Sequence, residues 1–170
     1  GDALQTAAFE VLSNRALADK PQDQLQMIRI LANASGSLGM CGGQGIDLYS
    51  VGQELTLPQL EMMHILKTGA LIRASVLLGS YCGSPLATEQ REALDHYAKC
   101  IGLAFQVVDD ILDCEADSAT LGKTAGKDVA NNKPTYVALL GMKGAKEKAA
   151  ELKSSALASL APFGEKANML

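Results

Sequence analysis

The stretch of sequence that decides the fold is IGLAFQVVDDILD, residues 101–113. Apolar residues dominate it, yet it carries three acids, Asp109, Asp110 and Asp113. On an α-helix, which turns by about 100° per residue, Asp109 and Asp113 lie one above the other and Asp110 lies beside them. Like charges at this spacing repel, and a carboxylate in apolar surroundings is costly unless it is paired or protonated. The pattern therefore predicts a helix whose acidic patch binds a cation.

Magnesium fits this patch best, because it prefers oxygen ligands and is usually held by one or two carboxylates together with substrate phosphates. The alternative is an acidic helix face that is simply solvated. The neighbours Phe105, Val107, Val108, Ile111 and Leu112 leave no solvated face for the acids, which favours the metal site.

The rest of the chain predicts helices and turns, since no stretch alternates apolar and polar residues for long enough to form a strand. We expect helices over residues 2–18, 21–38, 58–81, 88–114, 134–141 and 145–160, with loops over 49–55 and 118–133. At about 1.5 Å per residue the two longest helices would span roughly 35–40 Å, the full diameter of a compact body of this size. The sequence therefore predicts an all-α bundle of long, largely antiparallel helices.

The composition excludes several classes of protein. The 170 residues are 48% hydrophobic and 20% charged, as in one globular domain, and the net charge of −4 argues against a nucleic-acid surface. No apolar run reaches the roughly 18 residues that a membrane span needs. The four cysteines form no C-x-x-C pair, and neither histidine lies near a cysteine in a ligand pattern. We therefore expect no zinc site and a reducing, cytoplasmic location.

A second candidate segment is Lys67-Thr68-Gly69-Ala70, in the middle of a predicted helix. Gly69 costs about 1 kcal/mol there relative to alanine, which favours a functional break that turns a backbone carbonyl or the Thr68 hydroxyl toward a ligand. Lys67 would then reach a phosphate. The alternative is close packing of small residues, with the lysine extending to solvent.

A third candidate is the predicted loop GKTAGKD, residues 122–128, just beyond the acids. Its glycines let backbone amides approach an anion and Lys123 and Lys127 add positive charge, although the full P-loop pattern is absent. Lys133 would add a further charge at the entry to the next helix. The alternative is a solvated surface loop.

Gln44 and Asp47 are weaker candidates at the end of a glycine-rich stretch that begins at Gly39. The glycines also suit close helix packing. In that case the two polar side chains would be helix caps or solvated.

Taken in order, these segments resemble the trans-isoprenyl diphosphate synthases, and the bacterial farnesyl diphosphate synthases most closely. The matching stretches are Gly1-Asp2-Ala3-Leu4, Ala8-Phe9-Glu10, Gly42-Gly43-Gln44, Asp47-Leu48, Lys67-Thr68-Gly69-Ala70-Leu71, residues 105–113, Leu121-Gly122-Lys123 to Asp128, and Lys133-Pro134-Thr135-Tyr136. Each is only suggestive, but their combination and order are specific and cover nearly the whole chain. The resemblance implies the isoprenoid synthase fold.

The resemblance also implies a prenyltransferase, which joins isopentenyl diphosphate head to tail to an allylic diphosphate, dimethylallyl or geranyl, to give geranyl or farnesyl diphosphate. The allylic C–O bond ionises with magnesium on the departing diphosphate, the carbocation adds to the alkene, and a proton leaves. Asp109 would be the direct magnesium ligand, with Asp110 and Asp113 holding the metal's waters or the surrounding shell.

A set of substrate-binding residues follows from the same resemblance. Some would grip the allylic diphosphate or face the cation, and the others would organise the polar wall and the flap around it. They are Lys67, Thr68, Gln106 and Lys123 at the reacting centre, with Gln44, Asp47, Lys127 and Lys133 around it.

The chain departs from the family pattern because it lacks a second Asp-Asp pair, which family members carry on an earlier helix, and the upstream residues that hold isopentenyl diphosphate. We therefore expect residues 1–170 to be the C-terminal part of a single synthase domain, inactive alone. Such a part would form a homodimer or associate with its missing N-terminal half. Two alternatives are a non-catalytic partner subunit and a terpene synthase-like enzyme, the latter disfavoured by three phenylalanines, four tyrosines and no tryptophan.

Overall fold

The computed structural model describes residues 1–14, 16–121 and 134–170. In chain order, its helices are α1 (Asp2–Asn14), α2 (Pro21–Ser35), α3 (Met40–Tyr49), α4 (Leu57–His64), the π-helical η1 (Ile65–Gly69), α5 (Ala70–Tyr81), α6 (Thr88–Leu121), α7 (Tyr136–Ser159) and the 3₁₀-helical η3 (Ala161–Ala167). The described residues contain no strand, so the all-α prediction is confirmed.

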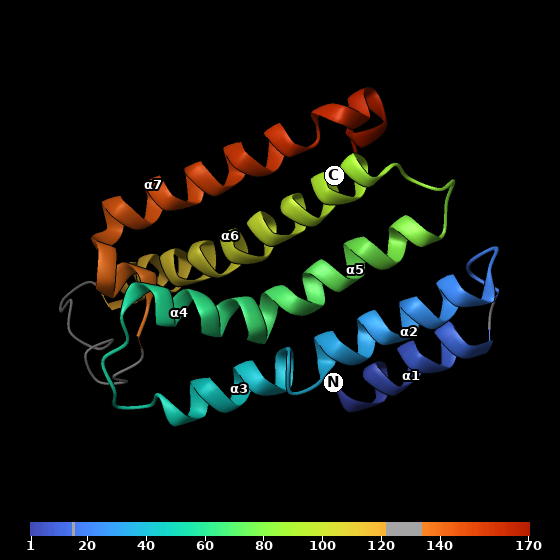
Figure 1. The fold of residues 1–170 in the computed structure, drawn as a ribbon. Coiled ribbons are helices and arrows are strands. Elements are labelled where there is room, and N and C mark those ends of the chain that lie inside the picture. Colours follow the sequence, from blue (N-terminus) through green and yellow to red (C-terminus); the bar gives the residue numbers. More distant parts are fainter. Residues whose placement is uncertain (15, 122–133) are drawn as a thin grey trace.

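The helices lie across the bundle largely in chain order and run antiparallel to their neighbours (Figure 1). α1 and α2 form one side and α7 the other, while α6 packs between α5 and α7. α3 continues the line of α2 and contacts η1. This arrangement is the predicted bundle of long helices, and it makes α6 a central element.

The helix expected over residues 21–38 ends earlier, at Ser35, and the glycine-rich stretch forms a helix of its own, α3. A short turn over residues 36–39 separates the two helices, and a Cβ added at Gly39 would lie 2.6 Å from the carbonyl carbon of Ala34. Only glycine permits that approach. The sequence-based boundary was wrong because periodicity does not reveal where two backbones touch.

The helix expected over residues 58–81 is confirmed as a continuous element, α4–η1–α5. It begins with a capping box, in which the Thr56 backbone N–H donates to Gln59 Oε1 over 2.9 Å. In the part of the chain that the structure describes, this helix alone is long and apolar enough to span a membrane, by length and composition. Its apolar residues do not form one uninterrupted run, because Glu61, Lys67 and Arg73 lie among them. The helix packs against α2, α3 and α6.

Two other boundaries differ from expectation. α1 ends at Asn14 rather than near residue 18, and α6 continues to Leu121 rather than residue 114. The two helices expected over 134–141 and 145–160 are confirmed as two helical segments of α7, which meet at a kink at Gly141, where φ is 71° and ψ is 164°. A positive φ suits glycine, so Gly141 ends the first segment as expected.

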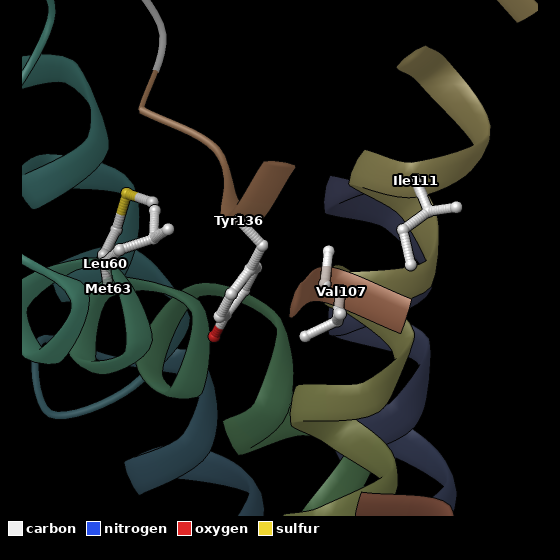
Figure 2. Close-up of a cluster of buried hydrophobic side chains, with 6 residues drawn as sticks. Leu60, Met63, Val107, Ile111 and Tyr136 are labelled. Carbon is white, nitrogen blue, oxygen red and sulfur yellow. The ribbon is translucent and has the colours of Figure 1, made fainter. Parts of the chain in front are cut away.

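The core nearest the acidic patch lies between α4, α6 and α7. Its fully or nearly fully buried members are Leu60, Met63, Val107, Ile111, Tyr136 and Ala145. Figure 2 shows the Tyr136 ring between the α4 side chains and Val107 of α6. Burial of this cluster fixes the turns of α4 and α6 from which the candidate site residues project.

Candidate functional site

The Lys67-Thr68-Gly69 segment forms a π-helical turn, η1, between α4 and α5. The irregularity expected at Gly69 is therefore present as a π turn inside a continuous helix, and single π turns inside α-helices are frequent at functional sites. Two helices press against this turn. A Cβ added at Gly43 of α3 would lie 2.5 Å from Lys67 Cα, and one added at Gly102 of α6 would lie 2.9 Å from Gly69 Cα. Glycine at both positions lets α3 and α6 touch the backbone of η1.

Asp47 of α3 holds the Lys67 side chain. Lys67 Nζ lies 2.5 Å from Asp47 Oδ2, with the lysine side chain 30% exposed and the aspartate side chain 11% exposed. Asp47, which was expected in a polar wall, thus forms a partly buried ion pair with Lys67, whereas Gln44, on the same helix, is exposed. Thr68 is half-buried. The ion pair fixes the Lys67 ammonium group next to α3.

Four residues of α6 form a stripe that begins at the contact with η1. They are Gly102, Gln106, Asp109 and Asp113, spaced four, three and four residues apart, which places them on one helix face. Gln106 is half-buried, while Asp109 and Asp113 are exposed. The expectation that these two acids lack a solvated face was therefore wrong for this chain.

Asp110 lies outside this stripe, on a neighbouring face of α6, and contacts α7. Its Oδ2 accepts a hydrogen bond of 2.7 Å from the backbone N–H of Tyr136. Across the described residues, no three His, Cys, Asp or Glu side chains gather closely enough to hold a metal ion, so the three acids do not converge. The two exposed carboxylates still suit magnesium, which retains several waters and often uses one or two carboxylates with substrate phosphates.

The surface around Asp109 is apolar and open. A groove of about 570 Å³ runs between α6 and α7, lined mainly by apolar side chains and by Asp109 itself. Phe105 and Leu112 on its α6 side are each 57% exposed. The apolar neighbours inferred from sequence are thus present, but within the described residues nothing covers them.

Sequence reasoning missed a polar group, the Tyr136 hydroxyl, which is buried in the cluster between α4, α6 and α7. The Tyr136 ring stacks on His64, with centroids 5.6 Å apart. Burial raises the pKa of the Tyr136 hydroxyl above its usual range, and the nearby Glu61 and Asp110 carboxylates raise that pKa further. Glu61 Oε1 lies 3.4 Å from Lys148 Nζ of α7. One sequence signal could have pointed to this buried polar cluster. It is the i, i+3 spacing of Glu61 and His64, which places both side chains on one face of the helix that also carries Lys67.

One expectation about histidine and cysteine was also wrong. His96 Nε2 lies 3.5 Å from Cys100 Sγ, one turn along α6, and 3.0 Å from Ser155 Oγ of α7. The i, i+4 spacing of His96 and Cys100 places both side chains on one helix face, and among the described residues no third possible ligand joins them. It lies in the half of α6 that precedes Gly102, away from the acidic stripe.

The candidate lysines of the flap, Lys123, Lys127 and Lys133, lie outside the described residues. Their roles stay predictions. Thr135, two residues after Lys133, is described. It caps α7, because its Oγ1 accepts a hydrogen bond of 3.1 Å from Ala138 N.

A family model described as polyprenyl synthetase matches residues 1–161. The chain belongs to the polyprenyl synthetase family. It is 50% identical over 169 residues to the farnesyl diphosphate synthase of Escherichia coli, and the aligned region covers 97% of this chain and 56% of that relative. It is 43% identical over 164 residues to the chloroplastic geranylgeranyl pyrophosphate synthase of Capsicum annuum, and this aligned region covers 96% of the chain and 44% of that relative.

Solved structures of family members share the fold. A putative farnesyl-diphosphate synthase from Marinomonas sp. MED121 superposes with a TM-score of 0.80 at 44% identity, covering 97% of this chain and 55% of that one. A Helicobacter pylori geranyltransferase complexed with magnesium and isoprenyl diphosphate gives 0.79 at 36% identity, covering 96% and 53%. These matches confirm the isoprenoid synthase fold and the family resemblance. The chain spans about half the length of the curated polyprenyl synthetases it matches.

Proposed function

We propose that residues 1–170 are the C-terminal part of a single prenyltransferase domain that condenses isopentenyl diphosphate with dimethylallyl or geranyl diphosphate. The products are geranyl or farnesyl diphosphate and diphosphate. Membership of the polyprenyl synthetase family supports the reaction class. The farnesyl diphosphate synthases among its relatives support the short chain length.

The observation that carries this proposal is the α6 stripe that starts where Gly102 meets Gly69. Because Gln106, Asp109 and Asp113 share the helix face of Gly102, the acid pair lies on the face of α6 whose earlier turn contacts η1, and Asp109 also lines the groove beside α7. η1 presents Lys67, oriented by Asp47. A magnesium diphosphate needs carboxylates that hold the metal and a cation that binds the diphosphate oxygens. The two acids of α6 and Lys67 of the adjoining η1 are groups of these two kinds.

Each side chain has a distinct part in the proposed reaction. Asp109 and Asp113 would hold magnesium, which when bound neutralises charge on the departing diphosphate. Lys67, with the flap residues Lys123, Lys127 and Lys133, binds the diphosphate oxygens.

The allylic C–O bond breaks with its electron pair on the diphosphate, the alkene of isopentenyl diphosphate forms the new C–C bond, and a proton is lost. Thr68, together with the backbone carbonyl of the residue before it, faces the allylic cation. Gln106 lines the same site from α6, and Gln44 lies on its outer wall on α3.

Exposed apolar side chains beside the proposed site suggest that the chain associates with another protein segment. Phe105, Val108 and Leu112 are exposed beside the acids, and apolar faces of this kind are usually buried against a partner. We therefore propose that the chain forms a homodimer or associates with the N-terminal half of the domain, in the cytoplasm. Light scattering that finds only a monodisperse monomer, with no co-purifying peptide, would contradict the association.

Calorimetric titration with inorganic diphosphate tests the proposed function. The wild-type chain is expected to bind diphosphate only when magnesium is present, and Asp109→Ala is expected to weaken that binding by about tenfold or more. Glu89→Gln, an exposed acid in the first turn of α6, serves as the charge-matched control and should leave the affinity unchanged. A non-catalytic partner subunit has no need of this site, so absence of magnesium-dependent binding in the wild type would overturn the proposal.

A further inference from the structure

Asp110 differs from the two acids beside it in what its carboxylate contacts. Asp109 and Asp113 are exposed on one face of α6, whereas Asp110 is half-buried and bonded to the backbone of Tyr136 over 2.7 Å. Consecutive residues of an α-helix point about 100° apart. Asp110 therefore faces the start of α7, whereas Asp109 is exposed and lines the groove farther along α7.

The hydrogen bond satisfies a donor at the start of α7. The first N–H groups of a helix have no partner within it, and Tyr136 is the first residue of α7. The N-cap residue Thr135 accepts from the Ala138 N–H, and Asp110 of α6 accepts from the Tyr136 N–H. Two of these early donors are therefore satisfied. A carboxylate here also faces the positive end of the helix dipole. Asp110 thus joins α6 to α7 across 26 residues of sequence.

Packing around the bond fixes its position. Tyr136 is fully buried, and its cluster includes Val107 and Ile111, which flank Asp110 on α6. Figure 2 shows Tyr136 against the turn of α6 that carries these two residues. That same turn presents Asp109 toward the groove. Any rotation of α6 that moved the exposed acids would have to break the Asp110 bond and repack the ring.

We propose that Asp110 is a positioning residue, which fixes the turn of α6 bearing Asp109 and Asp113 by accepting the Tyr136 N–H, and which is not itself a metal ligand. The proposal rests on the proposed function, since that function assigns magnesium to the two exposed acids. A metal ligand at this position needs a carboxylate. A backbone anchor needs only a well-placed oxygen acceptor, which asparagine also carries. Asparagine and alanine at position 110 therefore separate the two roles.

Two measurements on the 170-residue chain test the anchor, with variants Asp110→Asn, Asp110→Ala and Asp109→Asn. Urea unfolding without metal is expected to show the folding equilibrium constant reduced about tenfold or more by Asp110→Ala and far less by Asp110→Asn, because only alanine leaves the Tyr136 N–H without its acceptor. Calorimetry with magnesium and inorganic diphosphate is expected to show Asp110→Asn close to wild type and Asp109→Asn about tenfold weaker or worse.

The outcomes distinguish this proposal from the proposed function. If Asp110→Asn weakens diphosphate binding as much as Asp109→Asn does, Asp110 is a ligand and the proposal is overturned. It is also overturned if Asp110→Ala unfolds at the wild-type urea concentration. If the wild type binds no diphosphate, the proposed function fails, while the urea comparison still decides whether Asp110 anchors α7.

Discussion

Lys67 Nζ of the π-helical turn and Asp47 Oδ2 of α3 lie 2.5 Å apart and form a partly buried ion pair. The pair connects residues 20 positions apart in sequence. It leaves Lys67 at the edge of the turn that meets the acidic stripe of α6. The geometry makes Asp47 the residue that orients the lysine proposed to bind diphosphate.

Asp47→Ala is expected to lower the free energy of unfolding by about 1–2 kcal/mol, because a charged hydrogen bond is lost and Lys67 keeps only part of its hydration. Lys67→Ala should lower the free energy of unfolding by a similar amount. The double variant should lower it by less than the sum of the two single effects. Chemical denaturation of the four proteins measures the coupling, which we expect to be about 0.5–2 kcal/mol. Strict additivity would show that the two side chains do not interact in solution.

Gly43→Ala is expected to destabilise the chain by about 1–3 kcal/mol or more, because the added methyl group would collide with the backbone of Lys67 and push α3 from η1. Gly45→Ala is the matched control two residues along α3, where an added Cβ meets nothing within 4 Å. That variant should gain about 0.5–1 kcal/mol from helix propensity. Thermal melting of both variants checks the prediction, and equal effects of the same sign would refute the close approach.

Tyr136→Phe is expected to be neutral or stabilising by up to about 1 kcal/mol near pH 7, since the Tyr136 hydroxyl is buried with no hydrogen-bond partner among the described residues. Burial raises its pKa, so the folded state keeps a proton that the unfolded state releases above about pH 10. The stabilisation from this group is therefore complete below about pH 10 and declines above it by up to about 1.4 kcal/mol per pH unit.

Urea unfolding of wild type and Tyr136→Phe between pH 8 and pH 11 measures this difference. The unfolding free energies of the two proteins should run parallel below about pH 10, and the wild type should fall faster above it. A constant difference across the whole range would mean that the hydroxyl ionises equally in the folded and unfolded states.

The chain alone is expected to show no turnover of dimethylallyl and isopentenyl diphosphates. The reason is that Asp109 and the apolar residues beside it are open to solvent, and water would capture a carbocation formed there. A product assay with magnesium checks the expectation against an intact family member. Turnover at a comparable rate would show that the 170-residue chain forms a closed site by itself.

Helical periodicity was sufficient to predict the all-α bundle and the long helices around Lys67 and Asp109. It also placed Asp109 and Asp113 on one face. It did not separate α2 from α3, because the turn between them depends on how closely Gly39 approaches Ala34. Spacing alone gives the direction of a side chain and not its partner, so it grouped Asp110 with the metal ligands, whereas its carboxylate contacts the start of α7.

The candidate site was predictable to the extent that its residues are close in sequence. The irregularity at Gly69 follows from a glycine inside an apolar helix, and it is present as a π turn. The pairing of Lys67 with Asp47 was not accessible, since it depends on Gly43 letting α3 touch η1. The exposure of Asp109 was also missed, because local apolar neighbours do not reveal whether another element covers them.

The most direct measurement is the affinity of magnesium and inorganic diphosphate for four proteins, wild type, Asp109→Ala, Lys67→Ala and the double variant. If the α6 acids and the π turn form one diphosphate site, each single variant should weaken binding by about tenfold or more, and the double variant should lose less than the product of the two, with a coupling of at least about 0.5 kcal/mol. Losses that multiply independently, or an affinity that neither variant changes, would contradict a shared site.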